Sequence, residues 1–358
     1  LTSISATSAS ANTSELINSI INEFNAKNAT ALDLGTIGTD GTYIYLETEQ
    51  TVSMPTDSNL TQKNDYVSID TVDYSKLIGE TVNVDLSTTI VTKSNGTTTS
   101  QDKIIDIEQV IGGSGNDILT GDDNINTLRG GAGDDIINGK KGNDILYGDA
   151  GNDTFISSID DGTDTIYGGA DSDTVDYSAE SSSIIVTLNN LAQTRVKING
   201  IDNDFIQEIE NITSGSGDDI LTGDINANTF KSNAGNDTLI GGAGNDYLDG
   251  GTNTDSSLEN DWVYYSSATS TGVTVDLTKT SAQTISATEG NDTLLNIENI
   301  LGSDFGDTLI GNEFNNTLDG GKGDDTLKGN AGNDSFIGGE GLDTVDYSDV
   351  SQKLYVDL

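Results

Sequence analysis

Apolar residues recur at every ninth position in three stretches of the chain, which begin at Gly112, Ser214 and Gly302. In each nonapeptide the first six residues are rich in glycine and polar side chains, and the eighth is apolar. Successive side chains of a strand point to opposite faces, so each nonapeptide predicts a tight turn and a short strand whose eighth residue points inward. The residues predicted to point inward are Leu119, Leu128, Ile137, Leu146, Phe155, Leu221, Phe230, Leu239, Leu248, Leu309, Leu318, Leu327, Phe336 and Val345.

Two nonapeptides form one coil of the predicted structure. Strands two repeats apart then stack on the same flank at the ordinary strand spacing of about 4.8 Å. We therefore predict an all-β fold, a parallel β-roll in three blocks joined by β segments, with a small N-terminal region that holds one short helix. The predicted divisions are an N-terminal region at 1–71, a first β segment and block one (112–178) at 72–200, block two (214–266) at 201–290, and block three (302–348) with a terminal strand at 291–358.

A larger unit repeats around the blocks. It opens with Val72-Asp-Tyr-Ser75, Val175-Asp-Tyr-Ser178, Val263-Tyr-Tyr-Ser266 or Val345-Asp-Tyr-Ser348. An alternating strand follows each opening, at 82–86, 184–188, 273–277 or 354–358. The approach segments Ile107-Glu-Gln-Val110, Ile209-Glu-Asn-Ile212 and Ile297-Glu-Asn-Ile300 lead into the nonapeptides. Repetition on this scale indicates stacked modules instead of independent globules.

The first 70 residues follow a different pattern. Apolar residues at helical spacing after Asn12 and Glu15 predict one amphipathic helix near residues 13–25. We expect this helix to pack onto a sheet end, with partner binding or secretion as the alternative role. The turn Thr39-Asp-Gly41 before the alternating segment 42–47 predicts strands with a hairpin.

Composition narrows the possible functions. The chain of 358 residues is 33% hydrophobic, and 59 acidic residues face 15 basic ones, which gives a formal charge of −44. So many acids would repel one another in a compact fold unless cations were bound. The negative charge also disfavours binding to nucleic acid and to anionic lipid.

Several kinds of chemistry are excluded because residue types are missing. The chain has no Cys and no His, so it can form neither disulfides nor zinc-thiolate sites, and it has no histidine for acid–base catalysis. No stretch approaches the ~20 apolar residues of a membrane span. The start Leu1-Thr2-Ser3 lacks an initiator Met and a basic signal-peptide head, which suggests a piece of a longer protein.

The sixth place of the nonapeptides supplies acidic ligands. Glycines in the first, second and fourth places permit positive φ and leave carbonyl groups exposed toward the loop interior. Carboxylates and carbonyls from two stacked loops suit a hard cation with 6 to 8 oxygen ligands, and Ca²⁺ fits better than Mg²⁺, which demands a tighter octahedron. The predicted carboxylate ligands are Asp117, Asp135, Asp144, Asp153, Asp164, Asp173, Asp219, Asp237, Asp246, Asp255, Asp261, Asp307, Asp325, Asp334 and Asp343. The predicted glycine ligands are Gly113, Gly115, Gly131, Gly133, Gly142, Gly151, Gly217, Gly235, Gly242, Gly244, Gly321, Gly323, Gly332, Gly339 and Gly341.

Some positions depart from this regular pattern. Asn126, Asn228 and Asn316 stand in the sixth place of the second repeat of each block, and we expect the first ion on that flank to be weak or absent. Asp164 lies within an irregular turn at 157–167 and Asp173 follows it, while Asp255 and Asp261 compete for one ligand place around an insertion at 256–260. Stacked pairs give roughly 11 Ca²⁺ ions. Trp262 next to the insertion is expected to cover the core, with a sugar-binding platform as the alternative.

Catalysis is not predicted. Neighbouring acids such as Asp134 and Asp135 resemble a glycosidase pair, but paired catalytic carboxylates face each other across a cleft, whereas neighbours on an extended turn point to opposite sides. No twelve-residue loop with a closing Glu can be aligned, which excludes an EF-hand. We therefore expect a protein that is not an enzyme.

The nonapeptides, of which Gly241-Gly-Ala-Gly-Asn-Asp-Tyr-Leu-Asp249 is a clear example, resemble the haemolysin-type calcium-binding repeats of RTX proteins, as do the flanking Val-Asp-Tyr-Ser and Ile-Glu-Asn segments. This resemblance implies a Gram-negative bacterial protein that is exported unfolded by type I secretion and folds outside in millimolar calcium. The Asn-bearing repeats, the insertion and the first 70 residues depart from the family pattern.

Such repeats occur in proteins of many functions, so the family alone does not define the role. We expect a structural part of a secreted surface-layer or other cell-surface assembly protein, which binds calcium and associates with itself or with other surface components. The alternatives are the folding and secretion module of an exported enzyme or toxin, and a calcium-rigidified adhesin. All three share a switch in which calcium binding and folding are one event.

Overall fold

The computed structural model describes residues 69–159, 161–189, 192–251, 260–268 and 270–348. Every regular element in these residues is a β-strand, and the strands of the repeats pair in parallel, which confirms the predicted all-β parallel roll. The chain divides into two units, Leu1–Tyr66 and Val67–Leu358, and all described residues belong to the second. The predicted helix at 13–25, the hairpin around 42–47 and the strand at 354–358 lie outside the described residues.

The strands form three sheets. The first has 14 strands, in the order β1 (Thr71–Asp73), β5 (Gln109–Ile111), β7 (Thr127–Ala132), β9 (Ile145–Ala150), β11 (Thr165–Ala170), β15 (Ile201–Gln207), β14 (Thr194–Ile198), β13 (Ile184–Thr187), β17 (Ile220–Thr222), β19 (Thr238–Ile240), β21 (Trp262–Tyr264), β25 (Asn299–Leu301), β27 (Thr317–Asp319) and β29 (Ser335–Ile337).

The second sheet has 12 strands, in the order β23 (Gln283–Ser286), β24 (Gly290–Leu295), β20 (Tyr247–Asp249), β18 (Thr229–Lys231), β16 (Asn211–Thr213), β12 (Thr174–Asp176), β10 (Thr154–Ile156), β8 (Ile136–Asn138), β6 (Ile118–Thr120), β2 (Thr81–Asp85), β3 (Ile90–Ser94) and β4 (Thr99–Lys103). The third has four, β22 (Thr274–Asp276), β26 (Thr308–Ile310), β28 (Thr326–Lys328) and β30 (Thr344–Val345).

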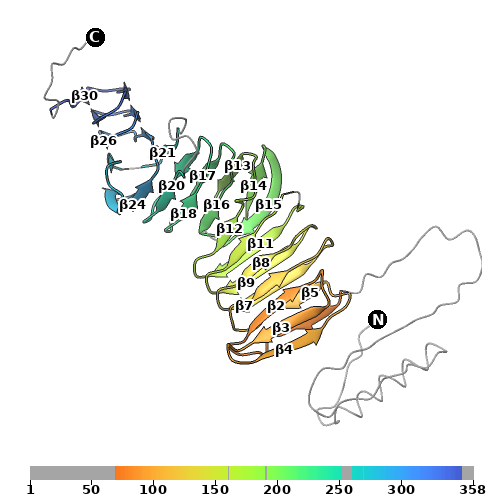
Figure 1. Cartoon of the computed structure of the whole chain (residues 1–358). Helices are drawn as coiled ribbons and strands as arrows, with labels where there is room; N and C mark the ends of the chain where they lie inside the picture. Colours follow the sequence, from red (N-terminus) through yellow and green to blue (C-terminus); the bar gives the residue numbers. More distant parts are fainter. Residues whose placement is uncertain (1–68, 160, 190–191, 252–259, 269, 349–358) are drawn as a thin grey trace, which may run out of the picture. The chain divides into compact units, whose positions relative to one another are not determined.

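Successive coils stack through strands that are two repeats apart, as the sequence predicts. Leu119 on β6 is in register with Ile137 on β8, and Leu128 on β7 is in register with Leu146 on β9. In Figure 1 the arrows of β16, β18 and β20 lie side by side in this way. Odd and even repeats therefore belong to opposite sheets of the roll.

The core is the row of eighth-place side chains between the sheets. Leu119, Phe155, Phe230 and Leu318 each have a relative exposure of 0%, as do most of the other predicted inward residues. The prediction fails at Val345, which is 40% exposed. It lies on β30, the last strand of the four-stranded sheet, so no further described strand packs beyond it.

Antiparallel strands lie in the segments before and between the blocks. β2, β3 and β4 form one meander, and β13, β14 and β15 form a second that stays within the 14-stranded sheet. β13 pairs antiparallel with β14 and parallel with β17, so it passes from the meander directly into block two. Of the predicted strands after the tyrosine motifs, those at 82–86, 184–188 and 273–277 correspond to β2, β13 and β22.

Candidate metal centre

The sixth-place aspartates lie at the last residue of each turn, immediately before a strand. Asp117, Asp135 and Asp153 precede β6, β8 and β10, and each has a relative exposure of 1%. Asp144 precedes β9 on the opposite flank and is equally buried. The turns thus bring acidic side chains of successive coils into two columns, in the parity that the sequence predicts.

The first column is a ladder of hydrogen bonds that ends at a glutamate. The amide N–H of Asp117 donates to Oδ1 of Asp135 at 2.7 Å, that of Asp135 donates to Asp153, and that of Asp153 donates to Asp173, both at 2.8 Å. The amide of Asp173 then donates to Oε2 of Glu210 at 2.9 Å. We call this column the glutamate-capped ladder. Block two repeats it through Asp219, Asp237, Asp261 and Glu298.

The second column begins at an asparagine and ends at a tyrosine. The amide of Asn126 donates to Oδ1 of Asp144, that of Asp144 donates to Asp164, and that of Asp164 donates to Asp204, all at 2.8 Å. Oδ2 of Asp204 accepts the hydroxyl hydrogen of Tyr177 at 3.0 Å. We call this column the tyrosine-closed ladder. Block two repeats it through Asn228, Asp246, Asp292 and Tyr265.

Block three has the same rungs but is more exposed at its end. Asp307 donates its amide hydrogen to Asp325 at 2.8 Å, and Asp325 donates to Asp343 at 3.2 Å. On the other flank Asn316 donates to Asp334 at 3.0 Å. Asp343 is exposed and Asp334 is half-buried, whereas Asp307 and Asp325 are buried.

Each ladder uses one carboxylate oxygen per rung and leaves the second oxygen of several rungs without a partner. A buried polar group without a hydrogen bond costs about 1–3 kcal/mol, and more when it is charged. A cation beside these oxygens would remove that cost, so they fit the predicted divalent ions. The buried oxygens without a hydrogen-bond partner are Oδ2 of Asp135, Asp144, Asp153, Asp173, Asp219, Asp237, Asp246 and Asp325.

Backbone carbonyls of stacked turns complete a set of oxygen donors. A Cβ placed on Gly131, whose φ is +113°, would lie 2.3 Å from the carbonyl oxygen of Gly113. A Cβ on Gly130 would lie 2.1 Å from Oδ2 of Asp135. Only glycine therefore fits at these two places, where the chain approaches the carbonyl of the preceding coil and the carboxylate of its own turn. Oxygen donors of this kind are those that Ca²⁺ prefers.

The acids form columns instead of compact clusters. Within the described residues, no three acidic side chains gather closely enough to hold a metal ion by themselves. An ion here would depend on one or two carboxylates together with turn carbonyls, and the donor set from the glycine and aspartate places stays a prediction.

Burial makes the ladder carboxylates weak acids in the protein alone. Desolvation, opposed in part by the backbone hydrogen bonds, raises the pKa of Asp135, Asp164 and Asp173 to about 8. The same cause raises the pKa of Asp237 and Asp246 to about 7. Holding the whole column ionised at neutral pH therefore requires compensating positive charge.

The competition between Asp255 and Asp261 for one ligand place stays open. Asp261 has a relative exposure of 1% and occupies a rung of the glutamate-capped ladder, whereas Asp255 lies outside the described residues. Asp164, within the irregular turn, and Asp173, after it, also occupy regular rungs. Trp262 flanks the buried Val263 on β21 and packs edge-on against Tyr264 at 5.7 Å, so its side chain lies on the outer side of the strand.

Four carboxylates of the ladders were not among the ligands predicted from the sequence. Asp292 stands in Gly290-Asn-Asp-Thr-Leu294, which repeats the last part of a nonapeptide outside the blocks. Asp204 precedes Phe205 and the buried Ile206 in a similar way. Glu210 and Glu298 hold the same place in the two Ile-Glu-Asn segments, and this recurrence was the available signal for their common role.

The described part of the chain contains no helix long and apolar enough to cross a membrane. Fold and turn chemistry together define a calcium-binding parallel β-roll. The family model of the RTX calcium-binding nonapeptide repeat (4 copies) matches residues 106–124, 120–155, 160–180, 209–231, 222–256, 301–335 and 310–345. Over these residues the chain carries the calcium-binding nonapeptide repeats of the RTX family. A search of curated proteins finds no match to it.

Proposed function

We propose that this chain is the calcium-dependent structural body of a secreted bacterial protein that takes part in a surface layer or another cell-surface assembly. The observation that carries the proposal is the pair of ladders, in which buried aspartate oxygens lack any partner from the protein. Calcium would make the folded roll rigid, and its absence would leave the chain unfolded.

The ladder aspartates and the turn carbonyls are the proposed ligands. Asp135, Asp153 and Asp237 would each supply the free carboxylate oxygen, and carbonyls such as those of Gly113 and Gly115 would supply the remaining donors. Calcium supplies positive charge and several coordination bonds to oxygen. The protein's own contribution is the register that stacks each carboxylate over the next turn. We propose roughly 11 ions, which metal analysis of the folded chain would count.

The calcium dependence fits export through a narrow channel. Extracellular calcium-binding modules typically have dissociation constants of about 10⁻⁴–10⁻³ M, far above cytosolic calcium. The formal charge of −44 would keep the chain open inside the cell, and binding and folding would occur together outside. We therefore place the folded protein outside the cell.

Continuity of the sheets favours a structural body. The 14-stranded sheet runs from β1 through the second meander to β29, so blocks and joining segments share one hydrogen-bonded surface. A terminal folding module of an exported enzyme or toxin is the alternative, and it would need no such length. We retain the predicted divisions at 72–200, 201–290 and 291–358 as a proposal about the repeating units.

Electron microscopy of the purified chain with calcium and with chelator distinguishes the two functions. Ordered sheets or filaments that form only with calcium would support the structural role. Folded particles that stay dispersed at high protein and calcium concentrations would contradict assembly and favour the module. Circular dichroism of the same samples shows whether calcium binding and folding are coupled.

A further inference from the structure

An aromatic and charged row lies on the outer face of the 14-stranded sheet, beside the turns that carry Asp153 and Asp173 of the glutamate-capped ladder. Arg129, Tyr147 and Tyr167 are in register on β7, β9 and β11. The rings of Tyr147 and Tyr167 are stacked, with centroids 4.9 Å apart and planes 8° apart. Arg129 covers the other side of Tyr147, with its guanidinium carbon 5.6 Å from the ring centroid.

This arginine is also held by a carboxylate. Nη2 of Arg129 donates to Oδ1 of Asp149 at 2.7 Å, and its Nε donates to Oδ2 of the same side chain. Two groups of β9 thus bind the guanidinium group of Arg129. The ring of Tyr147 lies against it, and the carboxylate of Asp149, two residues further along the strand, accepts both hydrogen bonds.

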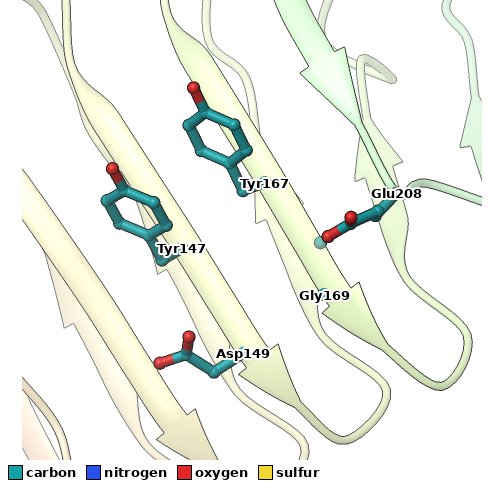
Figure 2. Close-up of a pocket in the computed structure, with 6 residues that line it drawn as sticks. Tyr147, Asp149, Tyr167, Gly169 and Glu208 are labelled. Atoms are coloured by element: carbon teal, nitrogen blue, oxygen red, sulfur yellow. The ribbon is translucent and has the colours of Figure 1, made fainter. Parts of the chain in front are cut away.

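A pocket lies against the tyrosine pair. Tyr147, Asp149, Tyr167, Gly168, Gly169 and Glu208 line it, and its volume of about 430 Å³ includes its open side. Figure 2 shows the parallel rings on neighbouring strands and the carboxylates of Asp149 and Glu208 on either side of Gly169. A Cβ on Gly169 would lie 2.1 Å from the carbonyl oxygen of Asp149, so the close approach of the strands keeps the floor free of a side chain.

The pocket resembles the Arg129 site but differs in the origin of its carboxylate: Gly169 is in register with Asp149, and the acid comes from Glu208, which follows the neighbouring strand β15. Gln207, not a basic residue, is in register with Tyr167. Within the described residues, the hydrogen-bond partner of the Glu208 carboxylate is the neutral amide of Gln207, whose Nε2 lies 3.3 Å from Oε1. Asp149 is already neutralised by Arg129. One negative charge and one aromatic ring therefore remain for an incoming group.

We propose that this pocket binds the guanidinium group of an arginine from a different protein, with Tyr167 as the stacking surface and Glu208 as the hydrogen-bond acceptor. Guanidinium stacks on aromatic rings and pairs with carboxylates through its planar donors, whereas a compact ammonium group matches this geometry less well. The charge of −44 attracts a basic partner over a long range.

A second copy of this chain is a poor source of the arginine. The chain contains only two arginines, Arg129 and Arg195. Arg129 is bound to Asp149, and Arg195 is bound to Asp202 and lies 4.6 Å from the centroid of the Phe205 ring. Both are already engaged on the same sheet, so the occupant must come from elsewhere. The inference does not depend on the proposed surface assembly.

The test uses the full chain in saturating calcium, labelled with 3-fluorotyrosine and followed by fluorine NMR. Argininamide is the probe, and the Tyr167 resonance is assigned with the variant Tyr167→Phe. We expect a saturable shift of this resonance with a dissociation constant on the order of 10–100 mM, because an isolated side chain makes only one ion pair and one stacking contact. Glu208→Gln should weaken binding at least threefold.

Glu313→Gln is the matched control, because it removes the same charge from an exposed turn of block three. It should leave the Tyr167 titration unchanged, and circular dichroism should show that both variants remain folded. The proposal is overturned if Glu208→Gln binds argininamide as well as the unsubstituted chain. It is also overturned if lysinamide or glucose shifts the Tyr167 resonance as strongly as argininamide.

Discussion

The two ladders of blocks one and two use the same hydrogen bond at each rung but differ in their ends. The glutamate-capped ladder of block one leaves Oδ2 of Asp135, Asp153 and Asp173 without a partner, whereas the tyrosine-closed ladder leaves only that of Asp144 among its described rungs. One column is acidic along its length, and the other begins with a neutral amide and ends on a phenol. We therefore expect the dependence on calcium to vary with the ends of a ladder as well as with its aspartates.

Chelation should have the largest effect, because it removes the cations from both ladders at once. With excess chelator at pH 7.5 we expect the β signal in circular dichroism to be lost and to return when calcium is restored. An unchanged spectrum, with metal analysis confirming that calcium is absent, would show that neither ladder needs cations.

Acid should partly replace calcium in the chelated protein. Burial raises the pKa of Asp135 to about 8 and that of Asp144 to about 7, above the ordinary value of 3.8. The folded form then binds protons more tightly than the unfolded chain, so this stabilisation is full below about pH 4 and is lost as the pH rises through 7 to 8. Denaturation of chelated protein should show higher stability at pH 4.5 than at pH 8. The opposite trend would contradict the assigned burial.

Matched substitutions compare the two columns directly. Asp135→Asn and Asp144→Asn keep an oxygen for the N–H of the neighbouring rung and remove one charge each. We expect the calcium midpoint of folding to rise about tenfold for Asp135→Asn, or about 1.4 kcal/mol, and less for Asp144→Asn, whose neighbour Asn126 is neutral. Equal shifts in calcium titrations followed by circular dichroism would remove the distinction between the ladders.

Tyr177→Phe tests the closed end. Loss of the hydroxyl leaves Oδ2 of the buried Asp204 without its donor, which should lower the free energy of unfolding by about 1–3 kcal/mol in saturating calcium. Denaturant titration measures this loss, and Tyr147→Phe on the outer face is the control, with a change below about 0.5 kcal/mol. An unchanged free energy of unfolding for Tyr177→Phe would contradict the stabilising role assigned to the hydroxyl.

Asn126→Asp should have the smallest effect and makes the second ladder resemble the first. The Nδ2 group of Asn126 is buried without an acceptor, so its removal breaks no hydrogen bond. The added carboxylate repels Asp144 at low calcium and offers a ligand at high calcium. We expect a steeper calcium dependence with a midpoint change of about twofold, measured by titration calorimetry. An unaltered titration would mean that no ion binds at this rung.

Much of the roll could be predicted from the sequence because its contacts repeat with the chain. The nonapeptide period alone places Leu119 over Ile137 and Asp117 beside Asp135, since each coil copies the one before it. The confirmed parts are the parallel all-β fold and the buried eighth-place residues such as Phe155 and Phe230. The ligand roles of the aspartates and glycines stay predictions.

The ends of the ladders could not be read from the period, because they depend on where the repetition stops. Asp204 and Asp292 belong to strands of the joining segments, and their partners Tyr177 and Tyr265 lie 27 residues away. The predicted burial of Val345 is wrong for the same reason. Burial there requires a further stacked coil, which cannot be predicted from the local sequence pattern. Pairing partners at such places follow from tertiary contacts alone.

The pairing of strands that are 18 residues apart within a block constrains how such a chain can change in length. Deleting two nonapeptides removes one complete coil and leaves every later strand on its original sheet. Deleting a single nonapeptide would move each later strand to the opposite sheet and would join the asparagine end of one column to the acidic run of the other. Evolution by duplication and loss should therefore favour even steps.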